Sequence, residues 1–300
     1  METKSVWTIM KILNWTKQYF ADKGVENPRL DAEILLCAVL KCERINLYID
    51  FERPLDESEL AQFKQMVIRR AQGEPLAYIL GEKAFMRNTF KVNKYTLVPR
   101  PETELLVEHL VRICEQINQE AKILDIGTGS GAIIVSLLDY LPQAKGVGVD
   151  ISAGALKVAK ENAVNIGVSK RAAFLHSDLF TAIPDEKKFD IIVSNPPYIP
   201  AKDISSLAKD VQNEPHSALD GGEDGLDFYR KITAEASLHM AEDGLLAFEI
   251  GINQSEAVSG LCRENGFTAV AVGKDYAGID RMVFAAKEGG KYADLLLEIK

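Results

Sequence analysis

Short apolar runs alternate with stretches of helix-spaced apolar residues along the second part of the chain, from about residue 121 onward. Short, largely apolar runs predict strands, and apolar positions three or four residues apart predict helices. The predicted strands are 123–127, 146–150, 172–177, 190–194, 245–250, 268–272 and 281–286, and the predicted helices include 131–140, 152–166, 226–241 and 253–265. This alternation predicts an α/β fold with a mainly parallel seven-stranded sheet and helices on both of its faces.

The first part of the chain is predicted to be helical. Helix-spaced apolar residues occur between Val6 and Phe20 and again over residues 30–40. A third helix is predicted over residues 56–72, because acids at its start suit a helix N-terminus and Gly73 ends it. No internal repeat interrupts this order.

Between the two parts, residues 77–81 and 89–92 are interpreted as short strands of a hairpin. We therefore predict four segments, which are a helical substrate-docking domain (1–75), a β-hairpin linker (76–98), a large α/β domain (99–287) and a C-terminal tail (288–300). Residues 293–297 of the tail are expected to add a helix, to which we assign no role.

Charge limits the partners that this chain can bind. The net charge of −9 lies entirely after residue 90, because residues 1–90 hold 13 basic and 13 acidic residues. An acidic second part argues against tight, nonspecific binding to a phosphate backbone. We therefore expect no direct contact with nucleic acid.

Other features of the composition exclude further classes. The four cysteines form no Cys-x-x-Cys pair and the four histidines have no metal-ligand spacing, so we expect neither a metal nor a structural disulfide. The N-terminus lacks a hydrophobic signal core, and no apolar run is long enough to span a membrane. We expect a cytoplasmic protein without membrane contact.

Three glycines at alternate positions follow the strand predicted over residues 123–127. The loop Gly127-Thr128-Gly129-Ser130-Gly131 runs directly into a helical stretch, and glycines there allow a ligand to approach the backbone. A lone glycine-rich loop can also be a plain turn. However, Asp150 ends the next strand about twenty residues later, the separation at which an acid binds a ribose hydroxyl in nucleotide-binding α/β folds. Because the spacing differs from the dinucleotide fingerprint, it favours a nucleoside cofactor such as S-adenosyl-L-methionine.

A second motif, Asn195-Pro196-Pro197-Tyr198, follows the strand predicted over residues 190–194. Each proline fixes its φ and lacks an N–H donor, and the residues before the prolines are restricted to extended conformations. The result is a stiff turn that presents an amide side chain, backbone carbonyls and an aromatic ring. These groups suit the binding of a planar –NH2 group, although an ordinary proline-rich loop would have the same sequence.

These motifs share one predicted edge of the sheet. The glycine loop, Asp150, Asp178 and Asn195 all follow predicted strands, and ligands of open α/β sheets bind outside the carboxyl ends of the strands. We therefore predict one site at that edge.

Several motifs together resemble the PrmC/HemK family of class I, Rossmann-like methyltransferases. Besides the glycine loop, Asp150 and the Asn195–Tyr198 turn, the chain is similar to this family at Arg70–Gly81, Pro99–Glu104, Gly221–Leu226 and Phe248–Gly251. The resemblance covers roughly residues 5–286. It implies an S-adenosyl-L-methionine-dependent enzyme that methylates the side-chain amide of the glutamine in the Gly-Gly-Gln motif of peptide chain release factors.

The resemblance also implies roles for individual residues. Cofactor binding is implied for Gly127, Thr128, Gly129, Ser130, Gly131, Asp150, Asp178, Leu179 and Asn195. Substrate binding is implied for Asn195, Pro196, Pro197, Tyr198, Arg100 and Glu102, and the catalytic set is Asn195, Pro196 and Tyr198. Glu249 is interpreted as structural.

Structural interpretations of the same residues stay open at this point. Asp150 could cap the helix that begins near Ser152, Asp178 could be a solvated turn residue, and Leu179 and Tyr198 could be packed core side chains. Pro101 suits the first turn of a helix, so its neighbours could form only a stable helix start.

Three other functions compete with glutamine methylation. Adenine-N6 nucleic-acid methyltransferases share the Asn-Pro-Pro-Tyr turn, because adenine also offers a planar –NH2 group, but they need a basic groove or a target-recognition domain. A nicotinamide-dependent oxidoreductase would leave that turn unexplained. A non-catalytic module that binds translation factors would bind without methyl transfer.

Overall fold

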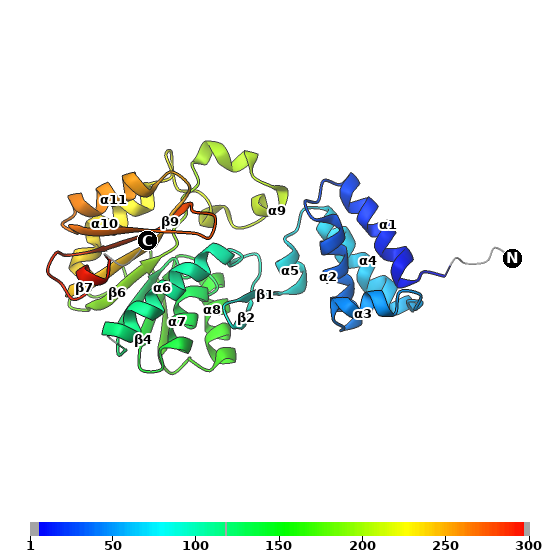
Figure 1. Ribbon diagram of the computed structural model, residues 1–300, viewed down its shortest axis with the longest axis horizontal. Helices are drawn as coiled ribbons and strands as arrows, with labels where there is room; N and C mark the ends of the chain where they lie inside the picture. Colours follow the sequence, from blue (N-terminus) through cyan, green and yellow to red (C-terminus); the bar gives the residue numbers. More distant parts are fainter. Residues whose placement is uncertain (1–5, 118, 297–300) are drawn as a thin grey trace. The chain divides into compact units, whose positions relative to one another are not determined.

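The computed structural model describes residues 6–117 and 119–296, and the chain divides into two compact units (Figure 1). The helical unit contains the chain up to Gly81 together with residues 208–213, and the α/β unit contains the remainder. Residues 297–300, including Leu297 of the predicted tail helix, lie outside the described residues.

Six helices make up the described part of the helical unit: α1 (Ile9–Asp22), α2 (Pro28–Leu40), α3 (Arg44–Ile49), α4 (Glu57–Ala71), α5 (Leu76–Leu80) and α9 (Lys209–Gln212). The three helices predicted from apolar spacing are confirmed as α1, α2 and α4. Their apolar faces meet in one core, in which Phe20, Leu35 and Phe63 are buried. α4 begins with a capping box, because Asp56 and Glu59 each accept a hydrogen bond from the other's backbone N–H.

One segment of the helical unit comes from far along the sequence. Arg70 is buried, and its guanidinium donates to Asp31 of α2 at 2.7 Å and to Asp210 of α9 at 3.0 Å. Nearby, Asn213 Nδ2 donates to the carbonyl of Gly73 at 2.9 Å. These polar contacts hold residues 208–213 on the helical unit.

The strand predicted over residues 77–81 is wrong. This run is helix α5, and the hairpin is formed by β1 (Glu82–Phe85) and β2 (Asn88–Lys91). A short apolar run cannot be assigned to helix or strand from periodicity alone. Here Pro75 precedes the helix with φ −54°, and Gly81 ends it in the left-handed region at φ 79°, which glycine adopts without strain.

The seven-stranded sheet of the α/β unit is confirmed. Its strands are β3 (Lys122–Ile126), β4 (Lys145–Asp150), β5 (Ala172–His176), β6 (Phe189–Ser194), β7 (Met240–Glu249), β8 (Ala269–Lys274) and β9 (Asp280–Ala286). They lie in the order β5-β4-β3-β6-β7-β9-β8, and only β9 runs antiparallel to its neighbours β7 and β8. The sheet is therefore mainly parallel, with a hairpin at one edge.

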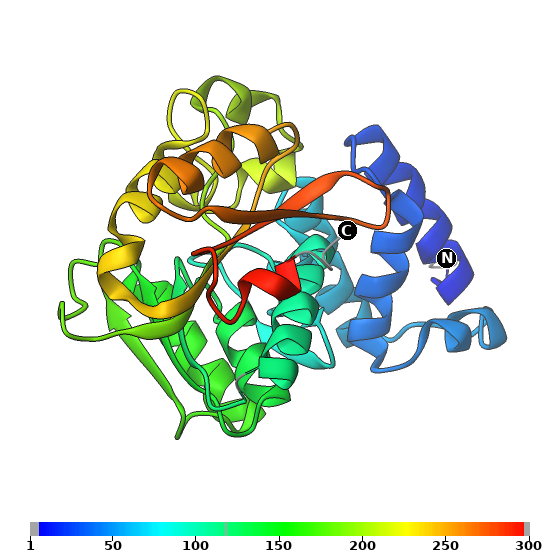
Figure 2. The same cartoon turned by 60° about the vertical axis from the view of Figure 1, so that its left-hand side comes forward.

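Helices cover both faces of this sheet (Figures 1 and 2). On one face lie α6 (Pro101–Ile117), α7 (Ala132–Tyr140) and α8 (Ala153–Ile166), and on the other lie α10 (Asp227–His239) and α11 (Ser255–Glu264). Neighbouring residues of a strand point to opposite faces. Accordingly, Ile191 packs in the first core and Ile192 in the second.

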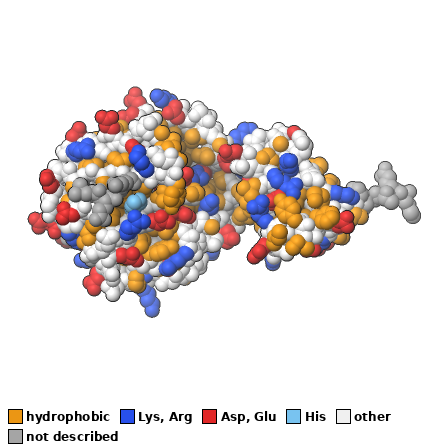
Figure 3. Space-filling view, viewed as in Figure 1, with side chains coloured by type: hydrophobic (Ala, Val, Ile, Leu, Met, Phe, Trp, Pro, Cys, Tyr) orange, Lys and Arg blue, Asp and Glu red, His pale blue; other side chains and the backbone are white. Residues whose placement is uncertain are grey.

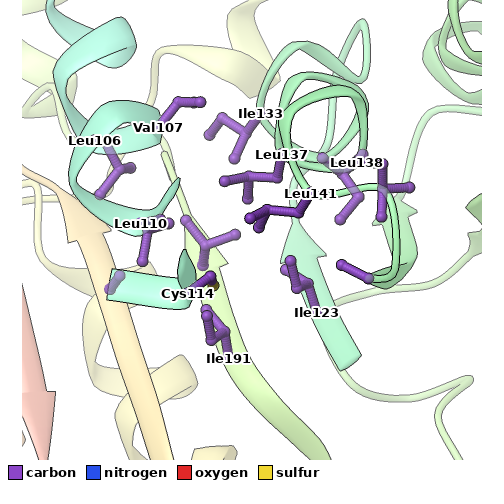
Figure 4. Packing of buried hydrophobic residues seen from close by; sticks show 14 of the residues in the cluster. Leu106, Val107, Leu110, Cys114, Ile123, Ile133, Leu137, Leu138, Leu141 and Ile191 are labelled. Atoms are coloured by element: carbon purple, nitrogen blue, oxygen red, sulfur yellow. The ribbon is translucent and has the colours of Figure 1, made fainter. Parts of the chain in front are cut away.

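The first core is formed where α6 and α7 lie against β3 and β6. Figure 4 shows Leu110, Leu137, Ile123 and Ile191 converging there. The predicted tail helix is present as α12 (Ala293–Leu296), and Leu296 is buried in the same core. The tail thus extends the packing of this face.

A substitution of Arg70 tests how much its ion pairs stabilise the helical unit. We expect Arg70→Met to lower the unfolding free energy of this unit by about 3–5 kcal/mol, because the buried carboxylate of Asp31 loses its partner. Both tryptophans of the chain, Trp7 and Trp15, lie in this unit, so tryptophan fluorescence during urea unfolding reports on it.

Arg69→Met is the matched control. Arg69 pairs with Glu74, and both side chains are substantially exposed, so its loss should cost less than about 1 kcal/mol. Equal effects of the two substitutions would contradict a special role for the buried Arg70 cluster.

Candidate functional site

A cavity of about 420 Å³ opens at the carboxyl edge of the parallel strands, within the usual ligand-pocket range of about 300–1,000 Å³. In the sheet register, Val149, Ile126, Ser194 and Phe248 form one row across four strands. The next residue of each strand is therefore brought to the same edge. The predicted single site at the strand ends agrees with this arrangement.

The glycine loop leads from β3 into α7 along the cavity. Gly127 and Gly129 have φ of 72° and 55°, which favours glycine over any residue with a Cβ. Both glycines line the cavity together with Thr128 and Ser130. The backbone N–H groups of Gly127 and Thr128 donate to the carbonyl of Val149 at 2.9 Å, which fixes the loop against β4.

Gly131 is the exception in this loop, because it is not among the residues that line the cavity. It is the N-cap residue of α7 with φ 81°, and a Cβ there would lie 3.2 Å from Ala159 Cβ and from Val135 Cγ2. Its absent side chain allows α7 to pack closely on α8.

Asp150 ends β4 and faces the cavity. Its Oδ2 accepts from the N–H of Gly129, and its Oδ1 accepts from the N–H of Ser152, each at 2.8 Å. Burial raises the pKa of this carboxyl group, although the backbone donors oppose the shift. The cap of α8 is instead Ser152, whose hydroxyl accepts from the N–H of Ala155. Asp150 therefore holds the glycine loop and is not the helix cap.

Asp178 and Leu179 also line the cavity, at the turn after β5. Asp178 is exposed, whereas Leu179 is half-buried and packs on the second core. Leu179 has φ 48°, an uncommon conformation for a branched residue and one that often marks functional sites. The Ser177 hydroxyl stabilises this turn by donating to the carbonyl of Leu179 at 2.7 Å.

The proline turn lies beside the glycine loop. Asn195, Pro196 and Pro197 all line the cavity. Ser194, at the end of β6, is anchored by its hydroxyl, which donates to the carbonyl of Ile126 at 2.7 Å. The Asn195 amide donates through Nδ2 to the Thr103 hydroxyl at 3.2 Å, so the amide is held by α6.

Tyr198 is placed behind this turn. It is not among the cavity-lining residues, its ring packs on the second core, and its hydroxyl lies 3.5 Å from Glu249 Oε1. Burial raises the pKa of Tyr198 further above its ordinary value. The packed-ring interpretation therefore describes its position in this structure.

Glycines of two family-like motifs surround Tyr198. A Cβ on Gly221 would lie 2.8 Å from Tyr198 Cα, one on Gly225 would lie 2.3 Å from its carbonyl oxygen, and one on Gly251 would lie 3.0 Å from its ring. These two motifs thus allow their backbone segments to approach the proline turn closely.

Arg100 lines the cavity and forms an ion pair with the buried Glu214. Glu214 also accepts from the N–H of Val98 at 2.8 Å, so it fixes the segment that precedes α6. Glu102 is not among the lining residues. Of the six predicted substrate-binding residues, Asn195, Pro196, Pro197 and Arg100 therefore meet at the cavity.

Sequence reasoning missed several residues of this site. Thr103 lines the cavity, and its hydroxyl donates to Glu249 Oε2 at 2.5 Å. Tyr95, Phe228 and Lys231 add aromatic and basic side chains to the lining. Thr103 and Glu249 both occur within the family-like motifs, which was the one available signal.

Two carboxyl groups are buried at the strand ends, Asp125 and Glu249. Burial raises the pKa of each to about 7, and the hydroxyl donors Thr128 and Thr103, respectively, oppose the shift. Asp125 Oδ2 accepts from the Thr128 hydroxyl at 2.6 Å.

Comparisons with known proteins identify relatives of this chain. Residues 11–81 match the family profile described as the PrmC N-terminal domain, and residues 101–246 match the methyltransferase small domain. A release factor glutamine methyltransferase of Geobacter sulfurreducens is 45% identical over 94% of this chain and 98% of that protein. The chain belongs to the release factor glutamine methyltransferase family.

Two further proteins are similar to this chain, one over most of its length and one over about two thirds of it. A Caulobacter vibrioides release factor glutamine methyltransferase is 40% identical over 93% of this chain and 96% of that protein. A crystal structure of a release-factor-specific protein-(glutamine-N5) methyltransferase from Alicyclobacillus acidocaldarius is 30% identical, with a TM-score of 0.40, over 66% of this chain and 99% of that chain.

As a member of this family, the chain is an enzyme that uses S-adenosyl-L-methionine. The cavity suits such a cofactor chemically, because the glycine loop exposes backbone, Asp150 offers carboxylate oxygens, and Ile151 and Leu179 offer apolar surface. Within residues 6–117 and 119–296, no helix is long and apolar enough to cross a membrane.

Asp125 gives a pH-dependent test. Its folded-state pKa is raised from 3.8 to about 7, so its contribution to stability is complete below about pH 4 and is lost as the pH rises through 7. This loss is on the order of 4 kcal/mol. We expect Asp125→Asn to make unfolding free energy, measured by circular dichroism in urea, decline less between pH 5 and pH 8. Parallel pH curves for the two proteins would contradict the raised pKa.

Proposed function

We propose that this enzyme transfers the methyl group of S-adenosyl-L-methionine to the side-chain amide nitrogen of the glutamine in the Gly-Gly-Gln motif of peptide chain release factors. The observation that carries this proposal is the position of Asn195 and Pro196 beside the glycine loop in one cavity. Acceptors for an amide N–H and a nucleoside-binding loop are thereby brought together.

The cofactor-binding residues are proposed from the cavity lining. Gly127 to Ser130 follow the methionine end of the cofactor, Asp150 accepts hydrogen bonds from the ribose hydroxyls, and Asp178 and Leu179 flank the adenine. Gly131 contributes indirectly, since it sets the packing of α7. When bound, the cofactor supplies a strongly electrophilic sulfonium methyl group.

Asn195 and Pro196 activate the glutamine. The lone pair of an amide nitrogen is delocalised into its carbonyl, and methylation requires that nitrogen to become pyramidal as positive charge develops on it. The Oδ1 of Asn195 and the carbonyl of Pro196 accept the two N–H bonds in that shape. These acceptors therefore stabilise the transition state more than the planar ground state.

The other predicted substrate residues act around this pair. Pro197 stiffens the turn, and Tyr198 supports it from behind through its contacts with the second core. Arg100, which lines the cavity, contacts the substrate. Glu102 contributes a negative charge close to the bound substrate.

We further propose that the helical unit helps to bind the release factor. Large apolar side chains are exposed on it, including Trp15, Ile45, Tyr48 and Ile49. Figure 3 shows hydrophobic side chains gathered on the visible face of this unit. Exposed apolar patches of this kind commonly mark protein interaction sites.

Labelled S-adenosyl-L-methionine tests the function directly. The enzyme is incubated with a purified release factor, and peptide mapping should locate the methyl group on the Gly-Gly-Gln glutamine. A release factor with asparagine at that position should remain unlabelled. Transfer to DNA adenine, with none to the release factor, would favour the adenine-N6 alternative.

Asn195→Ala tests the residue that we propose to bind the substrate amide. We expect this variant to lose at least about a hundredfold in kcat, since one lost oxyanion-hole-type contact costs roughly 10²–10³, while cofactor affinity changes little. Asn165→Ala, at an exposed position of α8, should keep the wild-type rate. Near wild-type turnover of Asn195→Ala would overturn the assignment.

Asp150→Ala should weaken cofactor binding first. The loss of charged acceptors for two hydroxyls is expected to raise the Kd of S-adenosyl-L-methionine by at least about 100-fold, since each charged hydrogen bond contributes roughly 1.5–3 kcal/mol. Calorimetry measures this change, and Asp185→Ala in an exposed turn serves as control. An unchanged Kd would exclude the ribose role.

A further inference from the structure

Three side chains form a buried hydrogen-bond chain that ends at the cavity. Glu249 closes β7, Thr103 lies in the first turn of α6, and Asn195 follows β6. The Thr103 hydroxyl donates to Glu249 Oε2 at 2.5 Å, and Asn195 Nδ2 donates to Thr103 Oγ1 at 3.2 Å. Glu249 and Thr103 are only 2% and 4% exposed, so the bond between them is shielded from bulk water.

The orientation of the Asn195 amide decides whether the site can work. The two ends of a primary amide are nearly equal in size, yet the oxygen only accepts and the nitrogen only donates hydrogen bonds. A substrate –NH2 group needs an acceptor, so Oδ1 must face it. Packing alone distinguishes the two orientations poorly, because rotation by 180° exchanges groups of similar shape.

A hydroxyl group has one proton, which transmits direction along the chain. An ionised carboxylate can only accept, so Glu249 accepts the hydrogen bond that the Thr103 hydroxyl donates. The lone pairs of Thr103 Oγ1 can then only accept, and this draws Nδ2 of Asn195 toward α6. The Oδ1 atom of Asn195 then faces the cavity, where it can accept a hydrogen bond from the substrate.

We propose that Glu249 and Thr103 are positioning residues that select the Asn195 orientation able to accept the substrate N–H. This inference rests on the proposed role of Asn195 in binding the glutamine amide. Tyr198 assists, because its hydroxyl lies 3.5 Å from the second oxygen of Glu249.

Protonation of Glu249 reverses the donor–acceptor direction of these hydrogen bonds. A carboxylic acid can donate to Thr103 Oγ1, and the Thr103 proton then points to the Asn195 oxygen, so Nδ2 faces the substrate. The charged and titratable groups around Glu249 are Glu102 of α6, Arg281 of β9, Tyr198 and Tyr229. Their combined effect with burial places its pKa at about 7, and activity should fall as the pH drops below this value.

Three variants test the proposal in one assay with saturating S-adenosyl-L-methionine and a release factor. Thr103→Val removes the relay and should lower kcat about 10–100-fold, with the cofactor Kd within twofold of wild type. Thr103→Ser restores the hydroxyl and should recover at least about a third of the wild-type kcat. Glu249→Gln should lower kcat about tenfold and abolish the acid limb of the pH–kcat profile, because its amide does not titrate.

Thr233→Val is the matched control. Thr233 is buried in α10 and accepts from Asn265 Nδ2 at 3.3 Å, so this variant removes the same type of contact outside the cavity. Its kcat should stay within twofold of wild type, with an unchanged pH profile.

The outcomes separate the inference from the function. If Asn195→Ala is inactive but Thr103→Val and Glu249→Gln keep the wild-type kcat and pH profile, the positioning role is wrong and the function stands. If the wild-type enzyme does not methylate the release factor, the function itself fails.

Discussion

Parallel pairing in a matched register is the constraint on which this site depends. Because Val149, Ile126, Ser194 and Phe248 form one row, the residues that follow them emerge side by side at strand spacing. Asp150, Gly127, Asn195 and Glu249 owe their proximity to backbone hydrogen bonds deep in the sheet. A slip of one residue in a single strand would also turn its apolar residues toward the wrong core. Packing in the two cores therefore stabilises the strand register that aligns the site residues.

Much of this arrangement could be predicted from the sequence. Strands β3 to β9 have apolar runs bounded by turn residues, and their predicted bounds are close to the observed ones, except that β7 begins earlier, at Met240. The edge of the sheet at which the cavity lies could be predicted from the ends of the strands alone. Residues 77–81 were assigned wrongly because the four apolar residues before Gly81 carry too little periodicity. Pro75 before the helix and Gly81 at its end decide the outcome.

Side-chain direction was less predictable than backbone position. Gly131 and Tyr198 belong to the expected motifs, yet one glycine serves helix packing and the ring lies behind its turn. Thr103 and Glu249 are distant in sequence and meet only because α6 crosses the end of β7. No local pattern marks such a contact. Pairings between distant buried polar residues emerge only when the sheet order is known.

The placement of residues 208–213 has a consequence for how this protein can evolve. The chain passes between the two units after Gly81, after Leu207 and after Asn213, so the helical unit is not a simple N-terminal attachment. A gene fragment that ended at Gly81 would encode Arg70 without Asp210. Exchange of this unit between enzymes by recombination at a single junction would separate partners that must be inherited together.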